Sequence, residues 1–176
     1  MRIIAGKYKG RRLEGPRGPG VRPTSDSLRE TLFNVLGDRV EGARVLDAFA
    51  GTGAVGLEAL SRGAAHVTFV ERDRDTARLL EANVATCGAG EACMIVRGDF
   101  ARTSGRFDLV WLDPPYEAPD LAAIVEQAAT LVEPAGLVVV EHSRRRSPPS
   151  VVPGLARTRE LVAGDSALSF YAPPQV

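Results

Sequence analysis

The sequence predicts an α/β fold built on a mostly parallel sheet of seven strands. From residue 43 onward, short apolar runs alternate with helical patterns, and near-continuous apolar strands between helices are typical of a parallel sheet. A glycine-rich turn, Gly51-Thr52-Gly53, follows the first of these runs, as in many nucleotide-binding folds. Toward the C-terminus, two apolar runs joined by Gly164-Asp165 predict an antiparallel hairpin at the sheet edge.

Length and charge predict one domain with a basic appendage. The chain has 176 residues and no net charge, yet its basic residues crowd the first thirty positions. We therefore expect a basic hairpin and arm over residues 1–23 and the main domain over residues 24–176. The two cysteines lack the spacing of a zinc site or a disulfide framework. Without a signal peptide or an apolar stretch of membrane-spanning length, the chain is expected to be cytoplasmic.

The N-terminal stretch predicts a hairpin, a linker and a first helix. Residues 2–5 and 11–14 look extended and flank a loop that contains Tyr8 and basic residues, so we expect a β-hairpin with a basic, aromatic tip. Residues 15–23 are rich in Gly, Pro and Arg and predict a linker. Thr24 or Ser27 is expected to cap the helix that follows, and Ser27 with Glu30 fits a capping box. Its apolar face is formed by residues 28, 32, 35 and 36.

The remaining elements follow from the alternation of apolar runs and helical periodicity. Strands are expected at residues 45–48, 67–70, 94–97, 107–112 and 137–140, and the C-terminal hairpin at residues 156–162 and 167–171. Helices are expected from the glycine turn to about residue 62, over residues 73–86, and over residues 121–132.

Acidic residues and glycines follow the predicted strands at their carboxyl ends, where open α/β sheets bind ligands. Gly51, Gly53 and Gly56 have G-x-G-x-x-G spacing, which permits close approach of a nucleotide-like ligand but also occurs in purely structural turns. Glu71 lies twenty residues after Gly51, the interval expected of an acid that binds ribose hydroxyls. Asp99 follows the third strand and could accept from an adenine amine, although Gly-Asp is also a common turn pair.

The tetrapeptide Asp113-Pro114-Pro115-Tyr116 is the most informative motif. Consecutive prolines cannot continue a central strand, so the chain leaves the sheet in a stiff turn. Asp113 and the carbonyl of Pro114 would then present two acceptors to an exocyclic amine, with the ring of Tyr116 stacked on the base. The alternative is a turn that merely ends a strand.

These motifs resemble those of a known family. Residues 47–53 resemble motif I of class I S-adenosylmethionine-dependent methyltransferases, and Asp-Pro-Pro-Tyr resembles the motif of enzymes that methylate exocyclic amines. Residues 1–7, 22–24, 29–34, 57–64 and 107–116 together resemble the bacterial RsmD family, which methylates N2 of a guanine in small-subunit ribosomal RNA. The resemblance extends from residue 1 to about residue 141 and fades over the last thirty residues.

The resemblance implies a Rossmann-like fold, S-adenosylmethionine as cofactor, no metal, and ribosomal RNA or the small ribosomal subunit as partner of a monomeric protein. Its catalytic residues would be Asp113, Pro114, Pro115 and Tyr116. The implied cofactor-binding residues are Asp47, Phe49, Ala50, Gly51, Thr52, Gly53, Glu71, Arg72, Asp99 and Phe100. The basic residues of the arm expected to bind RNA are Arg2, Lys7, Lys9, Arg11, Arg12 and Arg22.

Three other functions are compatible with parts of the sequence. Asp-Pro-Pro-Tyr suits an N6-adenine methyltransferase acting on RNA or DNA equally well. The glycine spacing permits a nicotinamide-dependent oxidoreductase, although the chain has no evident group for proton transfer and no second domain for a substrate. A non-catalytic RNA-binding assembly factor on the same scaffold is the third alternative.

Overall fold

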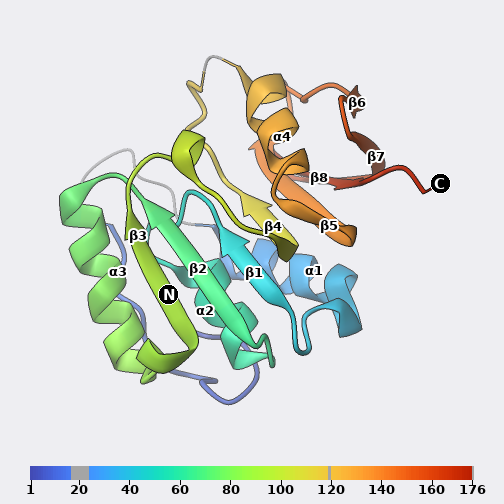
Figure 1. Cartoon of the computed structure of the whole chain (residues 1–176). Coiled ribbons are helices and arrows are strands. Elements are labelled where there is room, and N and C mark those ends of the chain that lie inside the picture. The colour runs from blue at the N-terminus through green and yellow to red at the C-terminus, as the bar shows by residue number, and fades with distance from the viewer. Residues whose placement is uncertain (17–23, 119, 176) are drawn as a thin grey trace. The chain divides into compact units, whose positions relative to one another are not determined.

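The computed structural model describes residues 1–16, 24–118 and 120–175 (Figure 1). Most of the predicted linker, and with it Arg22, lies outside the described residues. The chain divides into two compact units, Met1–Thr103 and Ser104–Val176, which are described in turn.

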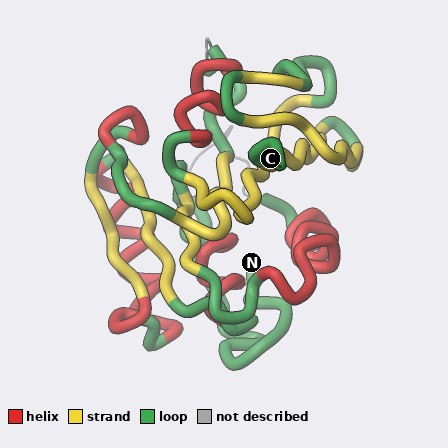
Figure 2. Tube along the Cα trace, turned by 45° about the vertical axis from the view of Figure 1, so that its right-hand side comes forward, coloured by secondary structure: helices red, strands yellow, loops and turns green. Residues whose placement is uncertain are grey.

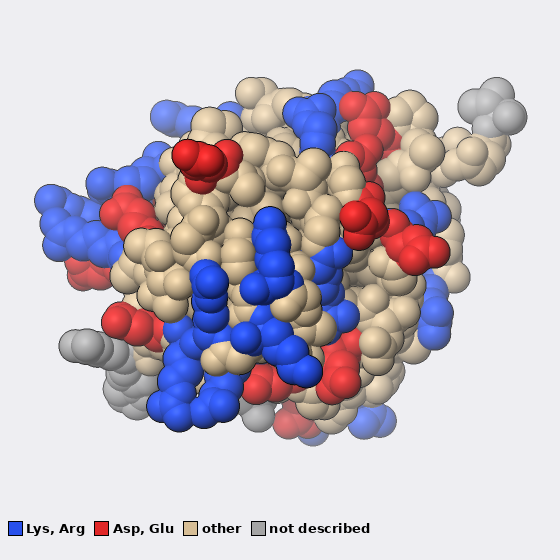
Figure 3. Space-filling view, turned by 90° about the horizontal axis from the view of Figure 1, so that it is seen from below, with Lys and Arg blue, Asp and Glu red and all other residues tan. Residues whose placement is uncertain are grey.

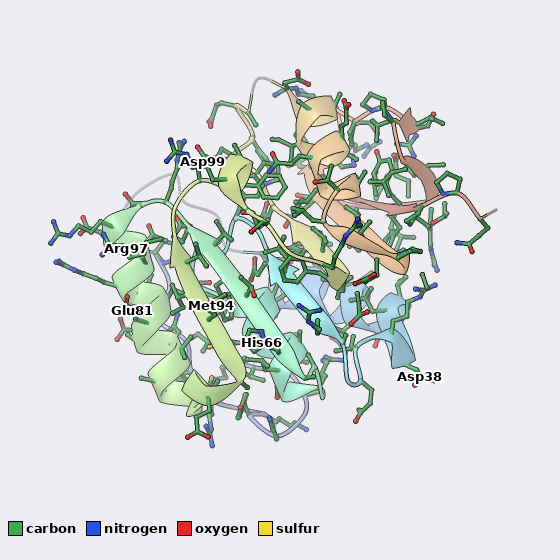
Figure 4. The ribbon with its side chains drawn as sticks, in the orientation of Figure 1. Asp38, His66, Glu81, Met94, Arg97 and Asp99 are labelled. Carbon is green, nitrogen blue, oxygen red and sulfur yellow. The ribbon has the colours of Figure 1, made fainter. Side chains whose placement is uncertain are left out.

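The first unit contains three parallel strands in the order β3-β2-β1. They are β1 (Arg44–Asp47), β2 (His66–Glu71) and β3 (Cys93–Arg97), each within two residues of its predicted bounds. Asp47 pairs in register with Phe69, and Glu71 pairs with Arg97. The acids that end β1 and β2, and Asp99 beyond β3, therefore lie toward one edge of the sheet, as predicted. Figure 4 shows Asp99 at this edge and His66 toward the opposite one.

Helices α2 (Ala54–Ser61) and α3 (Arg74–Cys87) pack on these strands, α2 against β1 and β2 and α3 against β2 and β3. Every residue of α2 is buried. Short 3₁₀ turns complete the unit at Gly37–Arg39, Gly90–Ala92 and Phe100–Arg102.

Helix α1 (Asp26–Leu36) starts from a cap that the sequence prediction placed wrongly. The N-cap is Ser25, whose hydroxyl accepts from the amide of Leu28 at 3.1 Å. Ser25 has extended backbone angles, which makes Asp26 the first helical residue and places Ser27 inside the first turn. There the carbonyl of Ser27 accepts from Thr31 Oγ1 at 3.0 Å, so Ser27 and Glu30 do not start the helix as a capping box.

The predicted N-terminal hairpin is also wrong in its regular form. Residues 1–16 contain one isolated antiparallel bridge, between Arg2 and Arg12, and otherwise run as a loop (green in Figure 2). The first arm cannot extend the ladder because the amides of Ile4 and Ala5 donate to the Glu58 carboxylate of α2, at 2.7 and 3.1 Å. The amide of Lys7 then donates to the carbonyl of Ser61 at 2.9 Å. Contacts with α2 thus replace strand pairing.

The predicted aromatic tip is buried as well. Tyr8 is only 8% exposed, and its ring lies 5.1 Å from both the Lys7 ammonium and the Arg11 guanidinium. Gly6 makes this close packing possible, since a Cβ atom there would lie 1.9 Å from the carbonyl oxygen of Ser61. The arm is therefore a docked segment of the first unit.

The second unit contains five strands and one helix. Its strands are β4 (Phe107–Leu112), β5 (Val132–Ser143), β6 (Val151–Val152), β7 (Leu155–Ala163) and β8 (Ser166–Ala172), in the order β4-β5-β8-β7-β6. Strand β4 is parallel to β5, and the other pairs are antiparallel, which confirms the predicted C-terminal hairpin. The described residues thus form eight strands where seven were predicted, because of the two-residue β6.

The boundary between helix α4 and strand β5 differs from the prediction. Helix α4 (Leu121–Ala129) ends three residues early, and Val132, predicted as helical, starts β5. Val132 pairs with Phe107 across a register shift, so the strand begins before the apolar run that marked it in the sequence. No helix in the described part of the chain is long and apolar enough to span a membrane.

Candidate active site

Asp47, the last residue of β1, is a buried acid with unused bonding capacity. It is 1% exposed, and its Oδ2 accepts from the amide of Gly56 at 3.1 Å. Its Oδ1 is buried without any hydrogen-bond partner. Burial raises the pKa of Asp47 to about 8, the Gly56 amide opposes this shift, and the charge of Glu71 adds to it. An unpartnered buried acceptor is suited to a ligand donor such as an amine.

The three glycines of the loop serve different structural purposes. A Cβ atom on Gly53 would lie 2.3 Å from Leu80, and one on Gly56 would lie 2.3 Å from the ring of Phe69. Gly51 has φ +56°, and a Cβ atom there would meet nothing within 4 Å. Gly53 and Gly56 are thus required for packing, whereas Gly51 leaves open space in which a ligand can approach the backbone.

Glu71 closes the loop from the end of β2. Its carboxylate accepts from the amide of Gly51 at 3.1 Å and from the amide of Asp73 at 3.3 Å. A carboxylate has about four acceptor positions, so two remain for ribose hydroxyls. Arg72, the next predicted residue, is exposed. Ala50 donates to the carbonyl of Val70 at 2.9 Å, which fixes the loop to β2.

Asp99 and two aromatic rings follow β3. One oxygen of Asp99 accepts from the amide of Ala101 at 2.9 Å, and the side chain is exposed. Phe100 is buried, and its ring lies 5.2 Å from that of half-buried Phe49 at an angle of 50°. This edge of the first unit therefore combines three carboxylates with an aromatic pair and an open glycine.

These residues fit S-adenosylmethionine by the chemistry of their donors and acceptors. The cofactor carries amine and ribose donors and a positive sulfonium, and the edge offers acceptors with spare capacity, including the unpartnered Oδ1 of Asp47. Among the described residues, no group of three or more His, Cys, Asp or Glu side chains is placed to hold a metal ion.

The second unit presents the Asp-Pro-Pro-Tyr loop directly after β4. Asp113 is half-buried, Pro114 is buried and Pro115 is exposed. Tyr116 is 45% exposed, and its hydroxyl lies 2.8 Å from Ser166 Oγ at the start of β8. Its carbonyl accepts from the Arg146 guanidinium at 3.1 Å. Tyr116 is thus held through both its hydroxyl and its backbone carbonyl, and its ring is still accessible.

The tip of the arm, with Lys7, lies at the end of α2 that is remote from the cofactor loop. Arg2, Lys7, Lys9, Arg11 and Arg12 are all exposed. The tip of the arm is attached to Ser61, the last residue of α2, while the glycine loop precedes the first residue of that helix. Arg11 donates to the carbonyls of Thr86 and Cys87 at the end of α3. Figure 3 shows the molecule from below relative to Figure 1, and Lys and Arg side chains gather in the middle of the face seen there.

Sequence reasoning missed three residues that support the site. Asn83 of α3 donates to the carbonyl of Thr52 at 2.9 Å and exchanges two hydrogen bonds with the backbone of Glu14. It thereby joins the buried Thr52 of the loop to the arm. Ser166 and Arg146 fix Tyr116 in the second unit. Only Arg146 is marked in the sequence, because it belongs to the run Arg144-Arg145-Arg146. A single Asn or Ser has no such mark.

An α/β sheet with acids after its parallel strands, an open glycine loop and an Asp-Pro-Pro-Tyr turn defines an S-adenosylmethionine-dependent methyltransferase. The chain belongs to the RsmD-like family described as Conserved hypothetical protein 95, whose model matches residues 1–172.

Individual proteins agree with this assignment. The chain is 39% identical to ribosomal RNA small subunit methyltransferase D of Escherichia coli over 180 residues, covering 97% of this chain and 89% of the relative. A solved structure of the E. coli protein yhhF has a TM-score of 0.86 and 37% identity and covers 98% of this chain and 97% of its own. An RNA methyltransferase from Salinibacter ruber in complex with S-adenosyl-L-homocysteine shares the fold, with a TM-score of 0.69 and 15% identity over 88% of this chain and 96% of that one.

Proposed function

We propose that the protein transfers a methyl group from S-adenosylmethionine to the exocyclic N2 amine of a guanine in small-subunit ribosomal RNA. The observation that carries the proposal is the Asp-Pro-Pro-Tyr loop, whose tyrosine ring is accessible and held by Ser166 at 2.8 Å. The E. coli relative, whose name states that it is a methyltransferase of small-subunit ribosomal RNA, supports the choice of substrate.

The first unit holds the cofactor in this proposal. Asp47 Oδ1 and the backbone of the glycine loop bind its methionine part, and Glu71 accepts from the ribose hydroxyls. Asp99 accepts from the adenine amine, beside Phe49 and Phe100. When bound, the cofactor supplies an electrophilic methyl group, so the chain itself mainly has to hold and orient the reactants.

The second unit holds the amine. Asp113 and the carbonyl of Pro114 accept its two hydrogens, which favours a pyramidal nitrogen with its lone pair directed at the methyl group. Tyr116 stacks on the guanine ring, while Pro115 stiffens the turn. A stacked or paired guanine must leave its helix to reach such a loop, at a cost of a few kcal/mol.

The arm binds RNA phosphates in this proposal. Lys7 and Lys9 are exposed at the end of α2 that is remote from the glycine loop. An eight-residue helix is about 12 Å long, so the tip of the arm binds phosphates at a distance from the cofactor loop. Arg2, Arg12 and Arg22 extend this contact in the proposal, and Arg11 contributes while it caps α3. We also propose that the protein acts in the cytoplasm as a monomer.

Substitution of Asp113 tests catalysis directly. Asp113→Asn keeps the size of the side chain but replaces one of its acceptor oxygens with a donor, so we expect methyl transfer to fall by at least 100-fold, about 2.7 kcal/mol of activation free energy. RNA binding and cofactor binding should remain. Tritiated cofactor with unmodified ribosomal RNA and with assembled small subunits measures transfer, and Asp108→Asn, an exposed acid within β4, is the matched control. Unchanged transfer by Asp113→Asn would refute the role, and a wild-type protein that binds RNA without transfer would indicate the assembly factor.

A further inference from the structure

Three consecutive arginines form a rigid turn at the end of β5 that the proposed function leaves without a role. Arg144, Arg145 and Arg146 are all exposed. The Arg144 amide donates to the carbonyl of Asp165 at 2.9 Å, and the amides of Arg145 and Arg146 donate to Ser143, at 3.3 and 3.0 Å. Three hydrogen bonds thus fix the backbone of this arginine turn (residues 144–146), while its side chains extend to the surface.

The arginine turn is attached to the Asp-Pro-Pro-Tyr loop within the second unit. The Arg146 guanidinium donates to the Tyr116 carbonyl at 3.1 Å. The Tyr116 hydroxyl lies 2.8 Å from Ser166 Oγ, and Ser166 pairs in register with Ser143, the residue just before the turn. The positive turn and the exposed tyrosine ring are therefore parts of one bonded group of residues.

The hydrogen bonds that fix the arginine turn leave the charges of Arg144 and Arg145 without a structural role. The side chains of Arg144 and Arg145 form no hydrogen bond or ion pair with any residue that the structure describes. Glu160 of β7, an acid in the same unit, is already paired with Arg157 at 2.8 Å. Adjacent like charges repel each other, and a bound anion would relieve this repulsion.

We propose that Arg144 and Arg145 bind backbone phosphates of the RNA strand that flanks the target guanine, while Arg146 holds the turn against Tyr116. The inference rests on the proposed function, because it assigns a site on the substrate of that reaction. A guanidinium binds a phosphate with two parallel hydrogen bonds, and phosphate contacts fix the register of a nucleic acid on a protein. An extruded base needs its flanking backbone held, and this turn lies beside the ring that stacks on that base.

The test compares a double variant with one of equal charge. Arg144→Ala/Arg145→Ala removes both free guanidinium groups but keeps Arg146, whereas Arg39→Ala/Arg78→Ala removes two exposed arginines of the first unit. RNA affinity is measured over a series of salt concentrations with a fragment of small-subunit ribosomal RNA. Kinetics with the same fragment give kcat, KM for RNA and the affinity for S-adenosylmethionine.

We expect the double variant to lower the slope of log affinity against log salt by about 1.4 to 1.8, which corresponds to two phosphate contacts. KM for RNA should rise about tenfold or more, while kcat at saturating RNA and cofactor affinity stay near the wild-type values. The control pair should retain the wild-type slope. Arg144→Lys/Arg145→Lys keeps both charges and should restore most of the slope while leaving KM raised, because lysine cannot form the paired bonds.

An unchanged salt slope and KM in the alanine double variant would overturn the proposal. A loss of activity on assembled subunits, with unchanged binding of naked RNA, would also overturn it and indicate a protein partner for the turn. Absence of methyl transfer by the wild-type protein would refute the proposed function alone, because the salt slope of RNA binding still tests the arginine turn.

Discussion

Glu58 is expected to be the most sensitive single position for the attachment of the arm. It is fully buried in α2, and each of its two carboxylate oxygens accepts hydrogen bonds from two donors. Oε1 accepts from the Ile4 amide at 2.7 Å and Arg29 Nη1 at 3.3 Å. Oε2 accepts from the Ala5 amide at 3.1 Å and Arg62 Nε at 2.9 Å. The carboxylate thus joins the arm to two helices.

Glu58→Gln removes the charge and turns one oxygen into a donor that faces two other donors. Arg29 is also fully buried, and its remaining acid, Asp26, has a largely exposed side chain. Removal of one partner of a buried ion pair costs about 3 to 5 kcal/mol, because the other charge stays desolvated. At about 2 to 4 °C per kcal/mol for a chain of this size, Tm should fall by about 10 °C.

Thermal unfolding and limited trypsin digestion measure the two consequences. With the arm released, cleavage after Lys7 or Lys9 should become faster than in the wild-type protein. Glu81→Gln, at an exposed position of α3 labelled in Figure 4, is the matched control and should change stability by less than about 0.5 kcal/mol. A Glu58→Gln variant within about 1 kcal/mol of wild-type stability, with unchanged cleavage, would refute the reasoning.

Four further substitutions test the cofactor edge. Because the pKa of Asp47 is raised to about 8 in the folded protein, its protonation contributes fully to stability below about pH 4, and this contribution is lost as pH rises through 8. Urea unfolding should therefore show that the free energy of unfolding falls by about 2 kcal/mol between pH 6 and pH 8, and Asp47→Asn should abolish this fall. A fall of equal size in Asp47→Asn and in the wild-type protein would contradict the reasoning. Gly51→Ala should cost about 1 to 2 kcal/mol and weaken cofactor binding, whereas Gly53→Ala, which would place its Cβ 2.3 Å from Leu80, should cost about 2 to 5 kcal/mol. Calorimetry separates the two, and equal stabilities would be unexpected. Asn83→Ala loses three hydrogen bonds and should lower stability by about 2 to 4 kcal/mol, with faster amide exchange in the loop; an unchanged exchange rate would exclude the proposed link.

Apart from the two-residue β6, the strands of both units could be predicted from local pattern, because each contains an apolar run bounded by polar residues. The bounds of β4 agree with the prediction, and those of β1, β2 and β3 lie within one residue of the predicted ones. Strand β5 was predicted at a third of its length, because Pro134 and Gly136 hide its beginning. The pairing of Val132 with Phe107 across a register shift is a tertiary effect that no local pattern reveals.

The arm shows why other features could not be predicted. A glutamate in a helix is usually a solvated charge, so no local pattern indicates that Glu58 is buried and accepts from the amides of Ile4 and Ala5, which would otherwise be available to a hairpin. Tyr8 reads equally well as an exposed tip or as a core residue, and only its surroundings decide. Asp47 and Glu71 were predictable because strand-end acids have a fixed place in α/β folds, whereas the packing role of Gly53 required knowledge of Leu80.

Identification of the methylated nucleoside tests the central claim most directly. The protein is incubated with labelled S-adenosylmethionine and either unmodified small-subunit ribosomal RNA or assembled small subunits, and the RNA is digested to nucleosides. The Asp-Pro-Pro-Tyr loop and the family predict N2-methylguanosine as the labelled product from at least one of the two substrates. N6-methyladenosine, or no labelled nucleoside from either substrate, would contradict the account.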